Sequence, residues 1–123
     1  MKAVTITSEG TPVAGNVLNV EDWCDITPDA GKVVVKTEAS ALNHLDLWVG
    51  IGMPGLNLTY PRVSGSDGCG IVTAIGEHVN DSWLGKRVLL NAAVRQVEPI
   101  LPNASYTPDD ICMIGEHDHG TNA

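Results

Sequence analysis

The most informative stretches of this chain are Ala41-Leu42-Asn43-His44-Leu45-Asp46-Leu47-Trp48 and Gly65-Ser66-Asp67-Gly68-Cys69-Gly70-Ile71-Val72. Each stretch crowds polar side chains and glycines into sequence that is otherwise apolar. Such a local conflict between chemistry and core formation is typical of functional or strained sites. The polar residues of the two stretches are therefore the first candidates for a functional site: Asn43, Asp46, Ser66 and Asp67.

Short strand patterns surround these stretches. Alternation and β-branched residues predict strands over residues 2–7, 17–23, 32–37, 70–75 and 86–90. Leu42, Leu45 and Trp48 recur at intervals of three, which predicts one or two helical turns over residues 41–49. Residues 50–61 are rich in Gly and Pro and are expected to form a loop, and no period is sustained after Asn91. Short strands without βαβ alternation favour a mainly β barrel or sandwich.

Composition narrows the class of protein. A chain of 123 residues with 43% hydrophobic residues suits one domain with a real core. The formal net charge of −8 and the scattered basic residues argue against nucleic acid and anionic membranes as partners. Cys24, Cys69 and Cys112 are too widely spaced for a compact metal motif, and no signal peptide is visible. We therefore expect free thiols and a cytoplasmic location.

Gly50-Ile51-Gly52-Met53-Pro54-Gly55 matches the G-x-G-x-x-G pattern of dinucleotide-binding loops. Such a loop must follow a strand and open a helix, so that backbone amides face the pyrophosphate. Here a helical turn is expected before the pattern, and Pro54 has no amide N–H. We interpret the pattern as a glycine-rich surface loop.

Several motifs together resemble one known family. They are Met1-Lys2-Ala3-Val4, Gly31-Lys32-Val33-Val34-Val35-Lys36, the two stretches quoted above, Pro54-Gly55-Leu56, Pro61, Ala74-Ile75-Gly76, Gly85-Lys86-Arg87-Val88, Gly115-Glu116-His117 and Gly120-Thr121-Asn122-Ala123. In this order they resemble the medium-chain dehydrogenase/reductase family, which includes alcohol dehydrogenases and quinone reductases. The match is collinear except over about residues 92–112, and Lys86 departs from the acidic residue that usually precedes the Arg.

The resemblance implies a GroES-like β-barrel with a few short helices over residues 1–123, the substrate-side domain of a two-domain oxidoreductase. In the family a Rossmann domain binds NAD(P), and hydride transfer occurs between the two domains. A complete member continues past Ala123, so we expect this chain to be truncated at its C-terminal end. We also expect it to lack the Rossmann domain, to bind no NAD(P) alone and to be inactive alone.

The resemblance also bears on zinc. Asn43 and Ser66 occupy the two positions where zinc-using relatives carry Cys and His ligands. An amide and a hydroxyl are poor zinc ligands compared with thiolate, imidazole or carboxylate. The region of the structural zinc loop, residues 92–110, contains no Cys. We therefore predict no metal site and a reductase that works without zinc, as quinone-reductase-like relatives with the same Asn do.

Other positions carry roles over by resemblance. Asp46 and Asp67 stand where carboxylates support the site, and with Asn43 and Ser66 they form the predicted catalytic set. His44 stands where a basic residue often contacts the cofactor phosphates, which a protonated imidazole can do. Leu45 and Trp48 replace the proton relay of zinc alcohol dehydrogenases, and Trp48 is expected to line the substrate pocket or the core.

Simpler readings stay open at this point. Asn43 and Asp46 can cap the short helix, Ser66-Asp67-Gly68 can be an ordinary turn, and His44 can be a surface residue. Cys69 is expected to be a small buried residue. Glu116-His117-Asp118-His119 suggests a metal cluster, although clustered His and Asp near a chain end are usually solvated.

Two other functions also stay open. One is a stand-alone GroES-like binding module that assembles as a homo-oligomer. The other is a zinc-dependent alcohol dehydrogenase that uses Asp46, Asp67 or His44 as atypical ligands.

Overall fold

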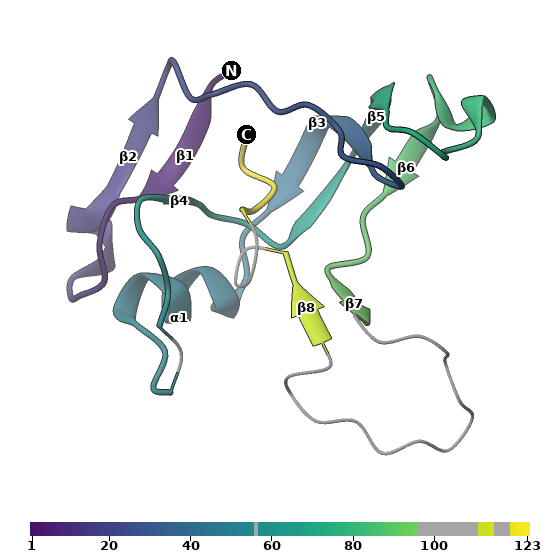
Figure 1. The fold of residues 1–123 in the computed structure, drawn as a ribbon. Helices are drawn as coiled ribbons and strands as arrows, with labels where there is room; N and C mark the ends of the chain where they lie inside the picture. Colours follow the sequence, from purple (N-terminus) through teal and green to yellow (C-terminus); the bar gives the residue numbers. More distant parts are fainter. Residues whose placement is uncertain (56, 96–110, 115–118) are drawn as a thin grey trace, which may run out of the picture.

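The computed structural model describes residues 1–55, 57–95, 111–114 and 119–123 (Figure 1). Within these residues short strands dominate, with one α-helix and two 3-10 helices. The elements, in chain order, are β1 (Ala3–Ile6), η1 (Val13–Asn16), β2 (Val17–Val20), β3 (Val33–Ala41), α1 (His44–Ile51), β4 (Arg62–Val63), β5 (Asp67–Ile75), η2 (Asp81–Trp83), β6 (Arg87–Leu89), β7 (Ala93–Arg95) and β8 (Ile111–Met113). The prediction of a mainly β fold with a few short helices is confirmed.

The described strands form three antiparallel sheets, ordered β2-β1-β4, β3-β5-β6 and β7-β8. The β3–β5 pair is the longest ladder, running from Val33↔Ile75 to Ala41↔Asp67. Two register shifts, at Val34/Val35 and Thr37/Ala39, mark bulges that bend the pair. This ladder brings the end of β3, just before Asn43, beside the start of β5 at Asp67.

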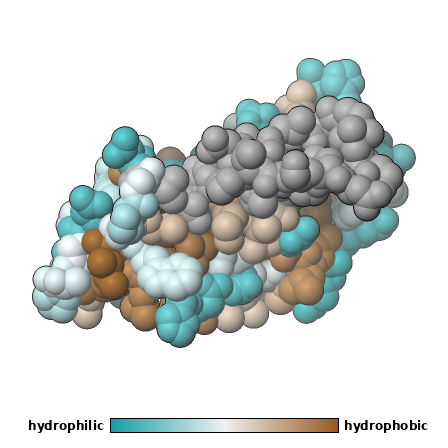
Figure 2. All heavy atoms as spheres, turned by 90° about the horizontal axis from the view of Figure 1, so that it is seen from below, coloured by the Kyte–Doolittle hydropathy of each residue, from teal (hydrophilic) through white to brown (hydrophobic). Residues whose placement is uncertain are grey.

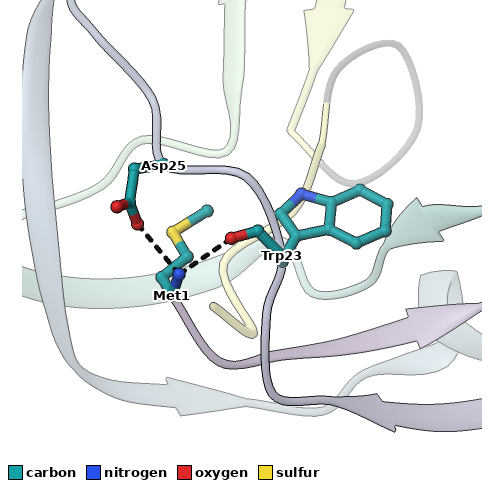
Figure 3. Close-up of polar contacts among 3 residues, drawn as sticks. All are labelled: Met1, Trp23 and Asp25. Carbon is teal, nitrogen blue, oxygen red and sulfur yellow. Dashed lines mark hydrogen bonds and ion pairs between the residues drawn. The ribbon is translucent and has the colours of Figure 1, made fainter.

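Beyond the first sheet, hydrogen bonds join Met1 to the segment that follows β2. The Met1 amino group donates to the Trp23 carbonyl and to Asp25 Oδ1, both at 2.8 Å (Figure 3). The Trp23 amide returns a bond of 2.9 Å to the Met1 carbonyl. Because Asp25 is exposed, the ion pair adds at most about 1 kcal/mol, and the backbone bonds hold the segment.

A small aliphatic core joins α1 to the first sheet. Ile6 of β1 packs with Leu45 and Val49 of α1, all nearly fully buried. Met53, Leu58, Tyr60 and Met113 pack around them. Each fully buried aliphatic side chain stabilises the fold by roughly 1.5–3 kcal/mol, so this cluster anchors the helix that begins at His44.

The structure corrects several boundaries. β5 begins at Asp67, three residues before the predicted strand, and α1 extends to Ile51. β7 and β8 lie where the sequence showed no period. Asp67 and Gly68 have low strand propensity, but pairing with β3 overrides it.

The G-x-G-x-x-G pattern lies at the C-terminal end of α1, where Gly52 is the C-cap with φ 101°. Gly50 and Ile51 belong to the helix and Gly50 is buried, so the predicted surface loop is wrong for these two residues, and only residues 52–55 lie outside regular structure. In the described residues no helix begins directly after the pattern. Within the described residues, none of the helices has the length and apolar character needed to cross a membrane.

Candidate active site

The N-terminus of α1 is held by a capping box. The Asn43 side chain accepts a hydrogen bond of 2.7 Å from the Leu45 amide, and the Asn43 amide donates to Asp46 Oδ2 at 2.9 Å. These bonds satisfy backbone donors that the first turn leaves without partners, and the Asp46 charge suits the positive end of the helix dipole. The reading of Asn43 and Asp46 as capping residues is therefore confirmed.

Asp46 also ties the helix to the segment before β5. Its second carboxylate oxygen, Oδ1, accepts a bond of 2.7 Å from the Gly65 amide. Gly65 has φ 96°, a left-handed conformation that L side chains rarely adopt. The two oxygens of Asp46 thus connect the helix start with the glycine that precedes Ser66.

The Asn43 side chain completes the connection. Its Nδ2 group donates to Ser66 Oγ at 2.6 Å and to Asp67 Oδ2 at 2.5 Å. Asn43 Oδ1 accepts the Leu45 amide, so the side-chain amide of Asn43 must place its nitrogen toward Ser66 and Asp67. The four predicted catalytic residues therefore form one hydrogen-bonded network, although 23 residues separate Asn43 from Ser66.

The network limits what each residue can do. Both side-chain protons of Asn43 and both oxygens of Asp46 are already engaged. Ser66 is 2% exposed, whereas Asn43 and Asp67 are exposed. Asp67 therefore presents a carboxylate to solvent, while Ser66 acts from within the fold as the partner that orients Asn43.

Asn43 and Ser66 offer zinc only poor ligand atoms. An Asn43 nitrogen that carries two committed protons cannot coordinate a metal, and a serine hydroxyl is a poor zinc ligand. Each carboxylate oxygen of Asp46 already accepts one backbone amide, that of Asn43 at Oδ2 and that of Gly65 at Oδ1. Among the residues that the structure describes, no three His, Cys, Asp or Glu side chains converge to hold a metal ion.

His44 and Trp48 lie one turn apart on the outer face of α1, with ring centroids 6.1 Å apart. Both are exposed, Trp48 to 53%. Trp48 is thus not a core residue, whereas Leu45 between them belongs to the core. His44 is thus an exposed residue at the positive, N-terminal end of the helix.

An apolar cavity of about 530 Å³ borders the network. Asn43, His44 and Asp46 lie at its edge. Its other lining residues are Val4, Ile6, Val13, Ala14, Val17, Leu42, Leu47 and Ser64. Leu42 and Leu47 are exposed. The face seen from below in Figure 2 shows hydrophobic patches between polar residues. The polar network therefore stands beside apolar surface, an arrangement typical of small-molecule sites.

One contributor was not anticipated from the sequence. Thr121 is 4% exposed, and its hydroxyl donates to the Asp67 carbonyl at 3.0 Å. The only sequence signal was the family match of Gly120-Thr121-Asn122-Ala123, which assigned it no role. Cys69, expected to be buried, is only partly buried in β5.

The histidine cluster near the chain end is only partly described. Glu116, His117 and Asp118 lie outside the described residues. His119 accepts a bond of 3.2 Å from the Val63 amide through Nδ1, and its ring meets Trp23 edge-on at 5.5 Å. His119 thus has a structural contact of its own.

Tyr60 is a titratable residue outside the network. Its hydroxyl donates to the Val49 carbonyl at 2.6 Å and so ties the loop after α1 to the helix. Burial, reinforced by the nearby Glu9 carboxylate, raises the pKa of Tyr60 above 10.0, and Arg62 opposes the shift. Tyr60 therefore stays protonated as a hydrogen-bond donor at neutral pH.

The fold and the network define a mainly β domain that carries an Asn-centred polar site at a helix N-terminus. Comparison with known families places it further: residues 29–116 match the alcohol dehydrogenase GroES-like domain. The chain belongs to this family, which confirms the resemblance and the GroES-like fold inferred from the motifs.

Individual relatives are consistent with this assignment. An alcohol dehydrogenase of Moraxella sp. (strain TAE123) is 38% identical over 74 residues, which are 60% of this chain and 22% of that protein. The quinone oxidoreductase of Sus scrofa is 34% identical over 61 residues, 50% of this chain and 18% of that protein. The structure of an NAD-dependent alcohol dehydrogenase aligns with a TM-score of 0.79 and 31% identity, covering 98% of this chain and 35% of that one. The chain thus spans about a fifth of the length of these curated relatives.

Proposed function

We propose that this chain supplies the substrate-side half of an NAD(P)-dependent oxidoreductase site that works without zinc. The observation that carries the proposal is the Asn43 network. At the two positions where zinc-using relatives hold metal, an amide and a hydroxyl bond to each other instead. The similarity to both alcohol dehydrogenases and quinone oxidoreductases supports a carbonyl, alcohol or quinone-type substrate.

The residues of this chain would bind and orient, and the cofactor would supply the hydride. Asp67, held by Asn43, offers an exposed carboxylate that can accept a proton or a hydrogen bond. The exposed His44 imidazole can donate a hydrogen bond to cofactor phosphates, which the positive N-terminal end of α1 also attracts. Trp48, exposed one turn further, would form a wall of the pocket.

The rest of the site would come from a Rossmann domain in the same protein. The exposed face of α1 supports this proposal, because His44, Leu47, Trp48 and Ile51 present aromatic and apolar groups to solvent at helical spacing. Cys24, Cys69 and Cys112 form no disulfide in the described part of the chain, which fits a reducing compartment such as the cytoplasm.

The test is turnover by the full polypeptide that carries this domain, with NADH or NADPH and a panel of quinones and aldehydes. We expect NAD(P)H oxidation to persist after treatment with a strong zinc chelator, with less than one zinc bound per chain by metal analysis. Loss of activity on chelation, restored by zinc, would show that the site uses metal through other ligands.

A second candidate function is a homo-oligomeric assembly module. β6 forms a ladder with β5 along one edge in the described residues, and its Leu89 is 84% exposed. An open edge with an exposed apolar residue favours pairing between chains. Light scattering of the chain distinguishes the two functions: a stable oligomer whose size changes with Leu89→Lys supports assembly, and a monomer at all concentrations contradicts it.

A further inference from the structure

The segment Gly120-Thr121-Asn122 lies alongside the residues that lead into β5. The Gly120 amide donates to the Val63 carbonyl at 2.8 Å. The amides of Thr121 and Asn122 donate to the Gly65 and Ser64 carbonyls, both at 3.0 Å. Three consecutive amides thus hold the backbone that carries Ser66 and Asp67.

Side chains add to this contact. The Thr121 hydroxyl donates to the Asp67 carbonyl at 3.0 Å, and Asn122 Nδ2 donates to Ser64 Oγ at 3.0 Å. Thr121, Ser64 and Ser66 are all at most 5% exposed. These bonds are therefore shielded from water, and breaking one leaves a buried polar group without a partner.

The packing is close enough to require glycine. A Cβ on Gly65 would lie 2.6 Å from Thr121 Oγ1, and one on Gly68 would lie 3.0 Å from Thr121 Cβ. A Cβ on Gly120 would overlap the carbonyl oxygens of Ser64 and Gly65. The two backbones meet directly, so a shift of Thr121 is transmitted to the segment between Gly65 and Gly68.

We propose that Thr121 is a positioning residue of the site, acting through Asp67. Its hydroxyl holds the Asp67 backbone, the Asp67 carboxylate accepts a hydrogen bond from the Asn43 side-chain amide, and that amide also donates to Ser66 Oγ. Thr121 therefore sets the geometry of the network without touching substrate or cofactor. The role of the network in catalysis rests on the proposed function, whereas the control of its geometry by Thr121 does not.

The experiment measures the side-chain amide of Asn43 by NMR in the full chain. Thr121→Val removes the hydroxyl at nearly constant shape, and Thr121→Ser keeps it. Thr5→Val is the matched control, because Thr5 is also buried and donates a side-chain bond to a carbonyl, that of Leu18 at 3.2 Å. If Thr121→Val does not fold, Thr121→Ala takes its place, since it removes the hydroxyl without the bulk of a valine.

We expect Thr121→Val to speed hydrogen exchange of the Asn43 side-chain amide by about fivefold, the factor for one lost hydrogen bond of typical net strength. The same variant should shift the resonances of that amide. In Thr121→Ser the exchange rate of the Asn43 side-chain amide should stay within about twofold of the native rate, because the hydroxyl and its hydrogen bond are kept. Thr5→Val should lower the melting temperature and leave the Asn43 amide unchanged.

An unchanged Asn43 amide in Thr121→Val overturns the proposal, as does equal acceleration in Thr5→Val. The measurement needs no turnover, so an enzymatically inactive protein would refute the proposed function and leave this result standing. Conversely, an unchanged amide in an active enzyme would refute the positioning role alone.

Discussion

Replacing Asn43 with Ala tests whether the network is more than a helix cap. The substitution removes the acceptor for the Leu45 amide and the two donated bonds to Ser66 and Asp67. Loss of an N-cap side chain costs about 1 kcal/mol. Leaving the buried Ser66 hydroxyl without its partner adds roughly 1–3 kcal/mol. We discount the bond to Asp67, because both groups are exposed.

The matched control is Asn80→Ala. Asn80 is also an N-cap, at η2, and its side chain accepts the Ser82 amide at 2.8 Å. Within the described residues, the Asn80 side chain makes this one hydrogen bond. We therefore expect Asn80→Ala to cost about 1 kcal/mol and Asn43→Ala to cost about 2–4 kcal/mol.

Urea unfolding followed by circular dichroism gives both values from the shift in midpoint at constant slope. The difference between the two variants, about 2 kcal/mol, measures the connection from the helix to the start of β5. Equal losses in the two variants would refute the reasoning, because Asn43 would then act as a cap and nothing more. A larger slope in Asn43→Ala alone would signal a change in the unfolded or native ensemble and would void the comparison.

Three further predictions follow from other contacts. Gly65→Ala should destabilise the fold by roughly 1–3 kcal/mol more than Gly55→Ala in urea unfolding, because both have positive φ but only Gly65 faces a neighbouring side chain at 2.6 Å. Tyr60→Phe should cost about 1 kcal/mol at pH 7. Because the folded-state pKa of Tyr60 is raised, the native protein should lose stability as pH rises above 10.0, and Tyr60→Phe should lose less. Parallel curves of unfolding free energy against pH for the two proteins would contradict this. His44→Ala should leave unfolding unchanged, and in the full enzyme it should raise the KM for NAD(P)H by about fivefold, equivalent to about 1 kcal/mol; an unchanged KM would remove His44 from the cofactor site.

The strands were predictable where side chains report their own environment. Residues 33–35 are consecutive valines and lie in β3, as their β-branched shape indicates. The start of β5 was not predictable in the same way. Asp67 and Gly68 form strand because Ala41 and Ser40 pair with them across the sheet. The glycine at position 70 also depends on the neighbouring strand, because a Cβ there would overlap the Lys36 carbonyl of β3.

The local half of the site was also accessible from sequence. Asn43 and Asp46 are three residues apart, which is the spacing of a capping box, and the bonds between them follow from helix geometry. The sequence also singled out Ser66 and Asp67, because they are polar residues in an otherwise apolar stretch. It did not show that Ser66 is buried, because burial depends on segments far away in the chain.

Residue chemistry and short spacings thus indicated a mainly β domain and the capped helix, and the family resemblance implied an amide and a hydroxyl where relatives bind zinc. The folded chain alone brought Asn43 against Ser66 and Asp67, and Thr121 against Asp67 from 54 positions away. Local patterns reflect the backbone within about one helical turn or one strand pair. Contacts at longer range depend on how the sheets and α1 pack, and so the connections of the network were decided by the tertiary structure.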